Sequence, residues 1–260
     1  MTRDPWHLLE EASLVLAVHA HPDDESLSTG ALLASLVTAG TRVELVTATR
    51  GEEGEVVEGA IDPDDRRALD EVRGAEIDAA TAALGITARH LLGAPPALAD
   101  GAEPREYRDS GMQWVREGLA GPAETAGPTS FTSRPFGEAV EDLVALIRTV
   151  RPDVVIGYDD EGSYGHPDHV HAHHVTVAAC EAAGTTMIEI ASDPESTGFS
   201  WREQRDSLAA VEEALRAYRT QLTVLGVEEA GLDHAGRIRI RHVGGQDDAI
   251  DMRTGLRLRQ

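Results

Sequence analysis

Short apolar runs and longer amphipathic segments alternate along the first three quarters of the chain. The apolar runs have the length and composition of buried β-strands; they span residues 14–18, 42–48, 88–92 and 153–158. The amphipathic segments have helical spacing, and most of them end at glycine; they span residues 30–40, 64–85, 136–150 and 166–184. This order predicts an α/β fold, with a mostly parallel sheet, right-handed crossovers and helices on both faces in a three-layer sandwich.

Residues 93–135 lack such a pattern and are rich in Gly, Pro and Ala. We expect the run 121–135 to be the least ordered part of the chain. A connection of this length in a compact domain is usually a lid, a binding loop or a disordered segment.

The last quarter has a simpler pattern. Residues 202–222 have the spacing of a helix, and residues 237–243 alternate like an edge strand that forms a small hairpin with the tail. Because no internal repeat or domain boundary is evident, we expect a single domain over residues 1–260. Its core would lie at about residues 13–190, and a helix with small strands would extend it over residues 200–260.

The composition and the first residues bear on where the protein is expected in the cell. Hydrophobic residues make up 41% of the 260, and no apolar stretch approaches the roughly 18 to 20 residues that span a membrane. The first residues, MTRDPWHLLEEAS, lack the basic and then apolar order of a secretory signal. Cys180 is the only cysteine, so an internal disulfide is impossible and a cytoplasmic location is expected.

The net charge of −23 and the absence of lysine exclude several partners and reaction types. Nucleic acids and anionic membranes bind basic surfaces, so neither is an expected partner. All 23 basic residues are arginine, which excludes Schiff-base and P-loop phosphate chemistry because both require lysine. A homo-oligomer stays open, because symmetric interfaces leave no pattern that can be read here.

The first cluster of chemical interest is HAHPDDE at residues 19–25, directly after a predicted strand. Three adjacent acids at the end of a buried strand repel one another, and a metal ion is the obvious cation to offset them. Alternatively, Asp23, Asp24 and Glu25 could be first-turn acids of a helix. His19 alternates along the strand and is expected to be a packed residue.

The second cluster is GSYGHPDHVHAHH at residues 162–174, also directly after a strand. Its proline suits the first turn of a helix, before which His166 would point into the crevice. His169 and His173 are four residues apart on one helix face, a spacing that could itself hold zinc. His171 and His174 fall on other faces and are expected to be exposed or structural.

The two clusters are expected to meet, because ligands of parallel sheets bind at the carboxyl ends of the strands. His21, Asp24 and one histidine of the second cluster would supply three ligands and leave the fourth position of a catalytic zinc site open. Iron(II) suits the same ligands.

The pattern AHPDDE (20–25) with a later HPDH (166–169) resembles the LmbE-like, or PIG-L, family of zinc-dependent de-N-acetylases over about residues 13–184. The resemblance implies a Rossmann-like α/β fold and removal of acetyl from N-acetylglucosamine-type sugars. GEEGE (51–55), LDEVRGAE (69–76) and RDSGM (108–112) are most similar to the branch of the family that acts on N-acetylglucosaminyl-inositol in the mycothiol pathway.

The resemblance also implies a role for each matching position. It implies that one zinc ion is bound by His21, Asp24 and His169. It implies that Asp23 is the general base and His166 the electrophilic or acid partner, which Asp168 would orient and keep protonated. Tyr164 would lie near the developing oxyanion. Arg73 and Asp109 match positions that contact the sugar-inositol substrate, although surface salt bridges explain them equally well.

Several alternatives stay open from sequence. Either Asp23 or His166 could protonate the departing amine. A mycothiol-conjugate amidase, a bacillithiol-type deacetylase or an antibiotic-tailoring deacetylase would share the metal site and differ at its rim. A nucleotide-binding module is disfavoured, because no G-x-G-x-x-G follows the first strand and HPDD would repel a pyrophosphate.

Overall fold

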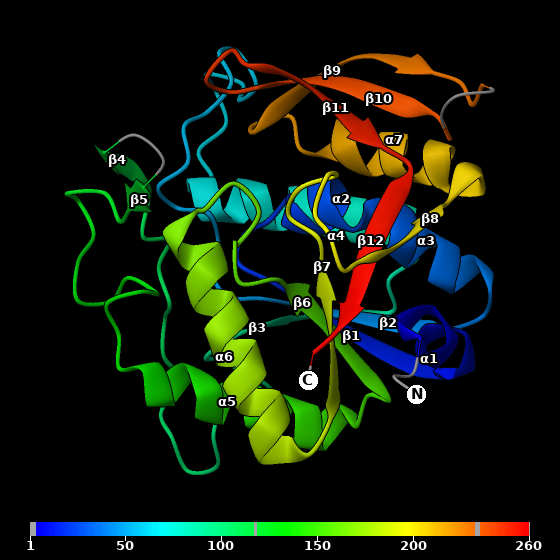
Figure 1. Cartoon of the computed structure of the whole chain (residues 1–260). Helices are drawn as coiled ribbons and strands as arrows, with labels where there is room; N and C mark the ends of the chain where they lie inside the picture. Colours follow the sequence, from blue (N-terminus) through cyan, green and yellow to red (C-terminus); the bar gives the residue numbers. More distant parts are fainter. Residues whose placement is uncertain (1–3, 117–118, 232–234, 260) are drawn as a thin grey trace.

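A seven-stranded sheet lies at the centre of the computed structural model, which describes residues 4–116, 119–231 and 235–259 (Figure 1). The strand order is β3-β2-β1-β6-β7-β12-β8. The strands are β1 (Leu14–His19), β2 (Arg42–Thr47), β3 (Ala88–Leu91), β6 (Val154–Tyr158), β7 (Thr186–Ile190), β8 (Ser200–Glu203) and β12 (Arg253–Leu258). The first five in this order are parallel, and β12 runs antiparallel to both of its neighbours. The predicted mostly parallel α/β fold is confirmed.

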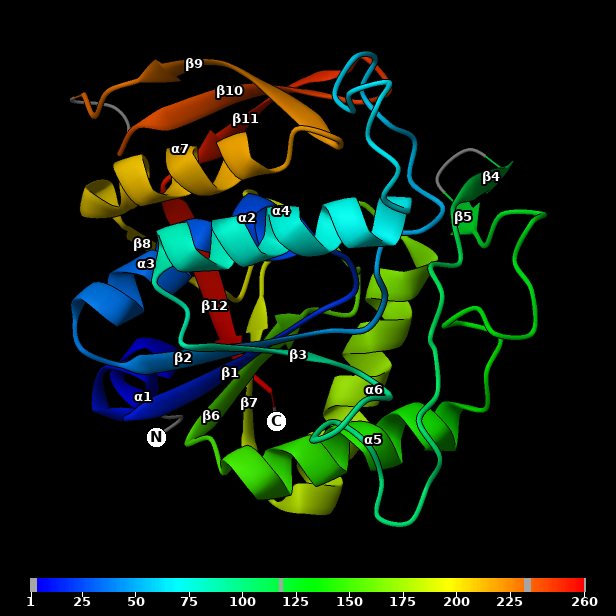
Figure 2. The same cartoon turned by 180° about the vertical axis from the view of Figure 1, so that it is seen from behind.

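Helices cover both faces of this sheet, as Figures 1 and 2 show. One face carries α1 (Pro5–Glu11), α3 (Gly30–Thr38), α4 (Leu69–Leu84) and α7 (Leu208–Ala217), and the other carries α5 (Phe136–Val150) and α6 (Pro167–Ala183). A hydrophobic core lies on each face of the sheet, and β1 contributes to both. Val15 and Ala17 face one core, and Leu16 and Val18 face the other. Alternation with apolar residues on both sides is what a doubly covered strand requires.

Two predicted helices are wrong at their ends. The helix predicted over residues 64–85 begins only at Leu69, because the preceding residues form side-chain turns in which the Asp65 carboxylate accepts the Arg67 amide. The helix predicted over residues 202–222 is a short 3₁₀ turn (Arg205–Ser207) followed by α7, which ends at Ala217.

The C-terminal quarter contains more strands than the sequence predicts. A second sheet of β9 (Leu222–Glu228), β10 (Arg237–His242) and β11 (Asp247–Asp251) covers α7 (Figure 1). Strand β10 is central in it, so the edge-strand prediction is wrong, although the hairpin of β10 with β11 is confirmed. Strands β7, β8 and β12 were not predicted, and β8 and β12 complete the main sheet rather than extend beyond it.

The segment expected to be the least ordered packs against the rest of the molecule. The longer segment over residues 93–135 contains a hairpin of β4 (Gln113–Arg116) and β5 (Leu119–Gly121). Phe131 anchors the run over residues 121–135. Phe131 is buried, its amide donates to the Arg108 carbonyl, and its ring lies 4.7 Å from that of His171.

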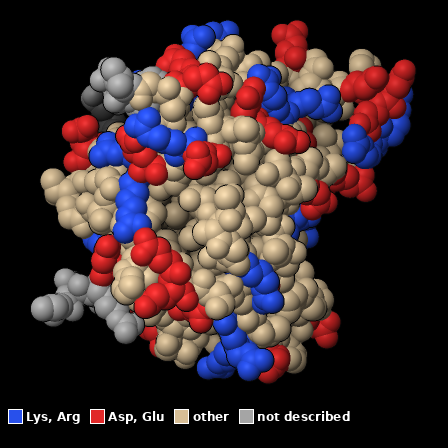
Figure 3. All heavy atoms as spheres, turned by 90° about the vertical axis from the view of Figure 1, so that its right-hand side faces the viewer, with Lys and Arg blue, Asp and Glu red and all other residues tan. Residues whose placement is uncertain are grey.

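Acids and arginines are mixed over the face of the molecule shown in Figure 3. Several acids and arginines form ion pairs, for example Arg216 with Glu212 and Arg205 with Glu203. Within the described ranges, no helix is long and apolar enough to cross a bilayer.

The chain order creates one special position in the main sheet. From β1 the chain continues to β2 and β3 on one side, whereas β6 and β7 lie on the other. Such a reversal of strand order opens a crevice at the carboxyl ends of the two central strands. The turns after β1 and β6 contain the two predicted clusters, which therefore meet there.

Candidate metal centre

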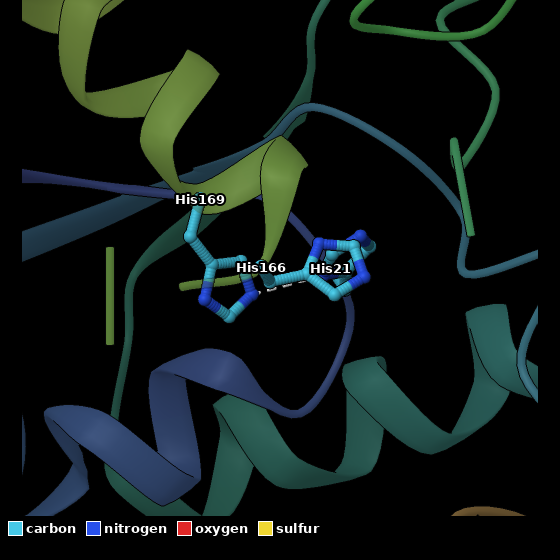
Figure 4. A group of neighbouring side chains, drawn as sticks. All are labelled: His21, His166 and His169. Atoms are coloured by element: carbon cyan, nitrogen blue, oxygen red, sulfur yellow. Dashed lines mark hydrogen bonds between the residues drawn. The ribbon is translucent and has the colours of Figure 1, made fainter. Parts of the chain in front are cut away.

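Three histidine rings from the two turns lie together at this crevice (Figure 4). His21 follows β1 and leads into the short helix α2 (Asp24–Ser28), whereas His166 and His169 begin α6. The ring centroids are 4.7 Å apart for His21 and His166, and 5.2 Å apart for His21 and His169. The group is positioned to hold a metal ion.

The three predicted ligands form a small triangle of residues, in which a different Asp24 oxygen lies close to each histidine. The Nδ1 of His21 lies 3.2 Å from the Nε2 of His169 and 3.3 Å from Oδ2 of Asp24, and the His169 Nε2 lies 3.2 Å from Oδ1 of Asp24. Donors at about 2.0–2.1 Å from a tetrahedral zinc ion are about 3.3–3.4 Å apart. The donor types and their separations therefore fit a cation of that size.

Two further carboxylates lie on the opposite side of the His21 ring. Its Nε2 is 3.1 Å from Oδ2 of Asp168 and 3.5 Å from Oδ1 of Asp109. An imidazole that donates from Nε2 to a carboxylate presents the Nδ1 lone pair to a metal. Burial lowers the pKa of His21, but the carboxylates of Asp109, Asp168 and Asp24 outweigh it and hold the pKa well above its usual value. The three carboxylates therefore favour a cation at this point of the site, either a proton on the ring or a metal ion.

The structure does not place the Asp168 carboxylate against the His166 ring, the contact on which the prediction that Asp168 orients His166 and keeps it protonated depends. The Asp168 carboxylate contacts His21 and accepts the Ser110 amide at 2.9 Å. His166 is instead the N-cap of α6, and its Nδ1 accepts the Asp168 backbone amide at 3.2 Å. Burial and the neighbouring His21 and His169 rings lower the pKa of His166 to about 3. The neutral ring is therefore favoured, and because its Nδ1 accepts the amide, its hydrogen then lies on Nε2.

The adjacent acids Asp23 and Asp24 have opposite environments. Asp24 accepts the His21 amide and the Tyr158 hydroxyl; burial raises its pKa, but His169 and His21 outweigh this and hold the pKa well below its usual value. Burial and the carboxylates of Asp24 and Glu25 raise the pKa of Asp23 well above its usual value. One carboxyl is thus an anion suited to a cation, and its neighbour is suited to hold a proton.

The helix-cap interpretation of these acids fails at Asp23. This residue occupies the N-cap position of α2, but its side chain makes no capping hydrogen bond and its φ is 104°. A positive φ costs an aspartate free energy and is often found where function requires it.

Sequence reasoning missed Tyr158, the last residue of β6. Its hydroxyl donates to Oδ2 of Asp24 at 2.7 Å and accepts the Ala20 amide at 3.0 Å. Its ring stacks on that of His169, 4.5 Å away and nearly parallel. An aromatic residue at the carboxyl end of the strand before the second cluster was the available signal. The same hydroxyl lies 3.2 Å from His19, which is a buried strand residue as expected.

The other residues of the second cluster lie outside the triangle. The Nδ1 of His173 lies 2.8 Å from the Tyr158 carbonyl, so the pair with His169 is not brought to one ion. His171 packs against Phe131, and His174 is exposed. Tyr164 is 61% exposed, with its ring 5.3 Å from that of His169, and so lies at the mouth of the site.

Arg73 is only 1% exposed, so the surface salt-bridge interpretation is wrong for it. Its Nη2 donates to the carbonyls of Gly54 at 3.0 Å and Glu55 at 2.9 Å, which holds the loop over residues 51–55. Asp109 is also buried, where its carboxylate accepts the Gly111 amide and faces His21. Contact of either residue with a sugar stays a prediction.

The fold and this cluster define an α/β protein with a candidate metal centre at the point where its strand order reverses. The family model described as PIG-L, GlcNAc-PI de-N-acetylase, matches residues 16–180, and the chain belongs to this family. The resemblance predicted over about residues 13–184 is confirmed.

Curated relatives extend the match. The 1D-myo-inositol 2-acetamido-2-deoxy-α-D-glucopyranoside deacetylase of Rhodococcus erythropolis is 43% identical over 194 residues, which cover 73% of this chain and 60% of that protein. The chain thus spans less than two thirds of that relative. A second deacetylase of the same name, from Catenulispora acidiphila, is 35% identical over 279 residues, covering 88% of this chain and 86% of that protein.

A solved structure with the same fold is the N,N'-diacetylchitobiose deacetylase from Pyrococcus horikoshii. It is 19% identical, with a TM-score of 0.58, and the match covers 83% of this chain and 73% of that one. At this identity the likeness concerns the fold alone.

Proposed function

We propose that the chain is a metal-dependent deacetylase that removes the acetyl group from an N-acetylglucosamine-type sugar conjugate, in particular N-acetylglucosaminyl-inositol. The triangle of His21, Asp24 and His169 carries the proposal. The Nδ1 of His21 and the Nε2 of His169 lie 3.2 Å apart, and each lies 3.2–3.3 Å from one Asp24 oxygen, separations close to those of donors around one tetrahedral ion. The names of the curated relatives support the choice of substrate.

The three residues would hold one zinc ion, and iron(II) suits the same donors. A divalent cation there supplies a Lewis acid, which makes water a better nucleophile and an amide carbonyl a better electrophile. Asp168 and Asp109 hold the His21 ring from its Nε2 side, so that its Nδ1 faces Asp24 and His169.

Asp23 is the general base in this proposal. Its raised pKa suits a carboxyl that takes a proton from the attacking water and keeps it during the reaction. Since His166 is neutral, Asp23 is also the group that returns this proton to the departing amine.

His166 and Tyr164 stabilise the developing oxyanion. A neutral imidazole whose Nδ1 accepts a backbone amide has its only hydrogen on Nε2, from which it can donate to an oxygen. The position of His166 at the start of α6 favours the neutral form, because a helix N-terminus disfavours a cation. The exposed Tyr164 hydroxyl would close over the substrate from the mouth of the site.

Arg73 would affect substrate binding indirectly, through the loop over residues 51–55 that it holds. Asp109 would contact a hydroxyl of the sugar directly. Arg73 is covered by residues 51–55, so this loop would present the substrate-facing surface.

The test measures acetate release by the purified chain from N-acetylglucosaminyl-inositol and from free N-acetylglucosamine, and release of the free sugar amine from a cysteinyl-glucosamine conjugate, each with and without a chelator. We expect acetate from the inositol glycoside, lost with the chelator and restored by zinc. Cleavage of the cysteinyl conjugate alone would favour an amidase. No acetate from any substrate with zinc supplied would overturn the proposal.

A further inference from the structure

The peptide unit that joins Pro22 to Asp23 is held at both of its polar atoms. The Pro22 carbonyl accepts a hydrogen bond from Nε2 of Gln221 at 2.8 Å. The Asp23 amide donates to Oε2 of Glu25 at 3.3 Å. The plane of this peptide unit determines φ of Asp23, which is 104°, and so determines where the Asp23 carboxyl points.

The contact at the amide end leads to a second residue of the same distant segment. Glu25 is fully buried, and its other oxygen, Oε1, accepts the Tyr218 hydroxyl at 2.7 Å. Ser26 donates to the same oxygen. Tyr218 is also fully buried, so its hydroxyl fixes the rotamer of Glu25 and thereby the acceptor of the Asp23 amide.

Both holding residues lie in the connection between α7 and β9, nearly 200 residues from the turn. Thr220 in this connection is anchored on α4, where its amide and hydroxyl donate to Glu76 at 2.9 and 2.6 Å. The family model ends at residue 180, so this connection lies outside the matched segment.

We propose that Tyr218 and Gln221 are positioning residues that hold the Pro22–Asp23 peptide in its strained orientation and so aim the Asp23 carboxyl at the site. A non-glycine residue keeps a positive φ only when its surroundings hold it there. Residues 218–221 provide those surroundings, because the turn itself offers no capping bond from the Asp23 side chain.

The kinetic test rests on the proposed deacetylase function. Tyr218→Phe and Gln221→Met each remove one hydrogen bond and keep the side-chain size. We expect each to lower kcat about 5- to 10-fold and both together about 25- to 100-fold, with KM and metal content unchanged. Arg219→Ala is the matched control, because Arg219 is exposed in the same connection; it should leave kcat unchanged.

Combining Tyr218→Phe and Gln221→Met with Asp23→Asn distinguishes a positioning role, exerted through Asp23, from a general structural role. If Tyr218 and Gln221 act through Asp23, the double variant should have no further effect on the residual rate of Asp23→Asn. Equal losses on both backgrounds would overturn the proposal. So would loss of metal from Tyr218→Phe or Gln221→Met.

A crystal structure of the double variant gives a readout that does not need activity. We expect the Pro22–Asp23 peptide to rotate and φ of Asp23 to become negative. If the wild-type chain releases no acetate, the proposed function fails and this structure alone decides the positioning role. An unchanged φ in the double variant would overturn it.

Discussion

His21 Nδ1 lies 3.2 Å from Nε2 of His169, although 148 positions separate the two residues in the chain. The sheet brings them together, because β1 and β6 are parallel neighbours and each histidine follows the carboxyl end of its strand. Two ring nitrogens at this distance share a hydrogen-bond proton, and a cation bound by both of them could take its place. The geometry therefore links the strand order directly to the candidate metal centre.

Asp23 and Asp24 should separate metal binding from turnover. Asp24→Ala should lose the ion, because it removes the anionic side of the triangle. Asp23→Ala should keep the ion and lose about 10²- to 10⁴-fold in kcat, because it removes the general base. Metal content by mass spectrometry, measured beside acetate release, checks both. Loss of the ion from Asp23→Ala would exchange the two roles.

Asp168→Ala should weaken metal binding about 10- to 100-fold, the usual effect of removing a partner that orients a ligand histidine. The cause is that His21 loses the acceptor that fixes its ring, while His166 keeps its bond to the backbone amide. Titration with a zinc indicator measures this. The exposed Asp160, replaced by alanine, is the control. If Asp168→Ala lowered kcat and left the zinc affinity unchanged, Asp168 would act on His166, as the sequence predicted, rather than on His21.

The sequence predicted that the two clusters meet, because their meeting depends only on local strand and helix patterns and on the order of the strands in the sheet. The apolar runs and glycine ends predicted β1, β6 and α6, and the strand-order rule predicted a shared crevice. The residue pattern itself gave His21 and Asp24 as candidate ligands, and the family resemblance added His169 as the third.

The details that failed depend on contacts across long loops. The Asp168 carboxylate faces His21 and accepts a hydrogen bond from the Ser110 amide, which lies in a segment without strand or helix periodicity. The strand over residues 253–258 was missed because its place in the sheet depends on pairing with β7 and β8 rather than on its own composition. Tyr158 looked like an ordinary strand residue, since an aromatic side chain at that position also suits a core.

Two glycines should respond in opposite ways to alanine. A Cβ at Gly54 would lie 2.7 Å from Nη1 of Arg73, so the guanidinium would have to move and lose its bonds to the loop carbonyls. Gly54→Ala should therefore raise KM several-fold and destabilise the fold by about 1–3 kcal/mol.

Gly74, on the same helix as Arg73, has no atom within 4 Å of its Cβ position. Gly74→Ala should stabilise the fold by up to about 1 kcal/mol, because alanine is the better helix former, and should leave KM unchanged. Thermal unfolding and steady-state kinetics check the pair. A rise of KM in Gly74→Ala, or none in Gly54→Ala, would contradict the role assigned to the loop.

Cys180 should be protected from alkylation in the folded chain. Burial, with a smaller effect of Glu181, raises the pKa of its thiol to about 12. A raised pKa favours the protonated thiol, whereas alkylation requires the thiolate. At pH 8 the thiolate fraction should be about 10³-fold lower than in an unfolded chain, where the pKa is about 8.5. Iodoacetamide labelling followed by mass spectrometry, with and without urea, measures this, and labelling should follow unfolding. Rapid labelling of the folded chain, at unchanged thermal stability, would show that α6 opens at Cys180 without global unfolding.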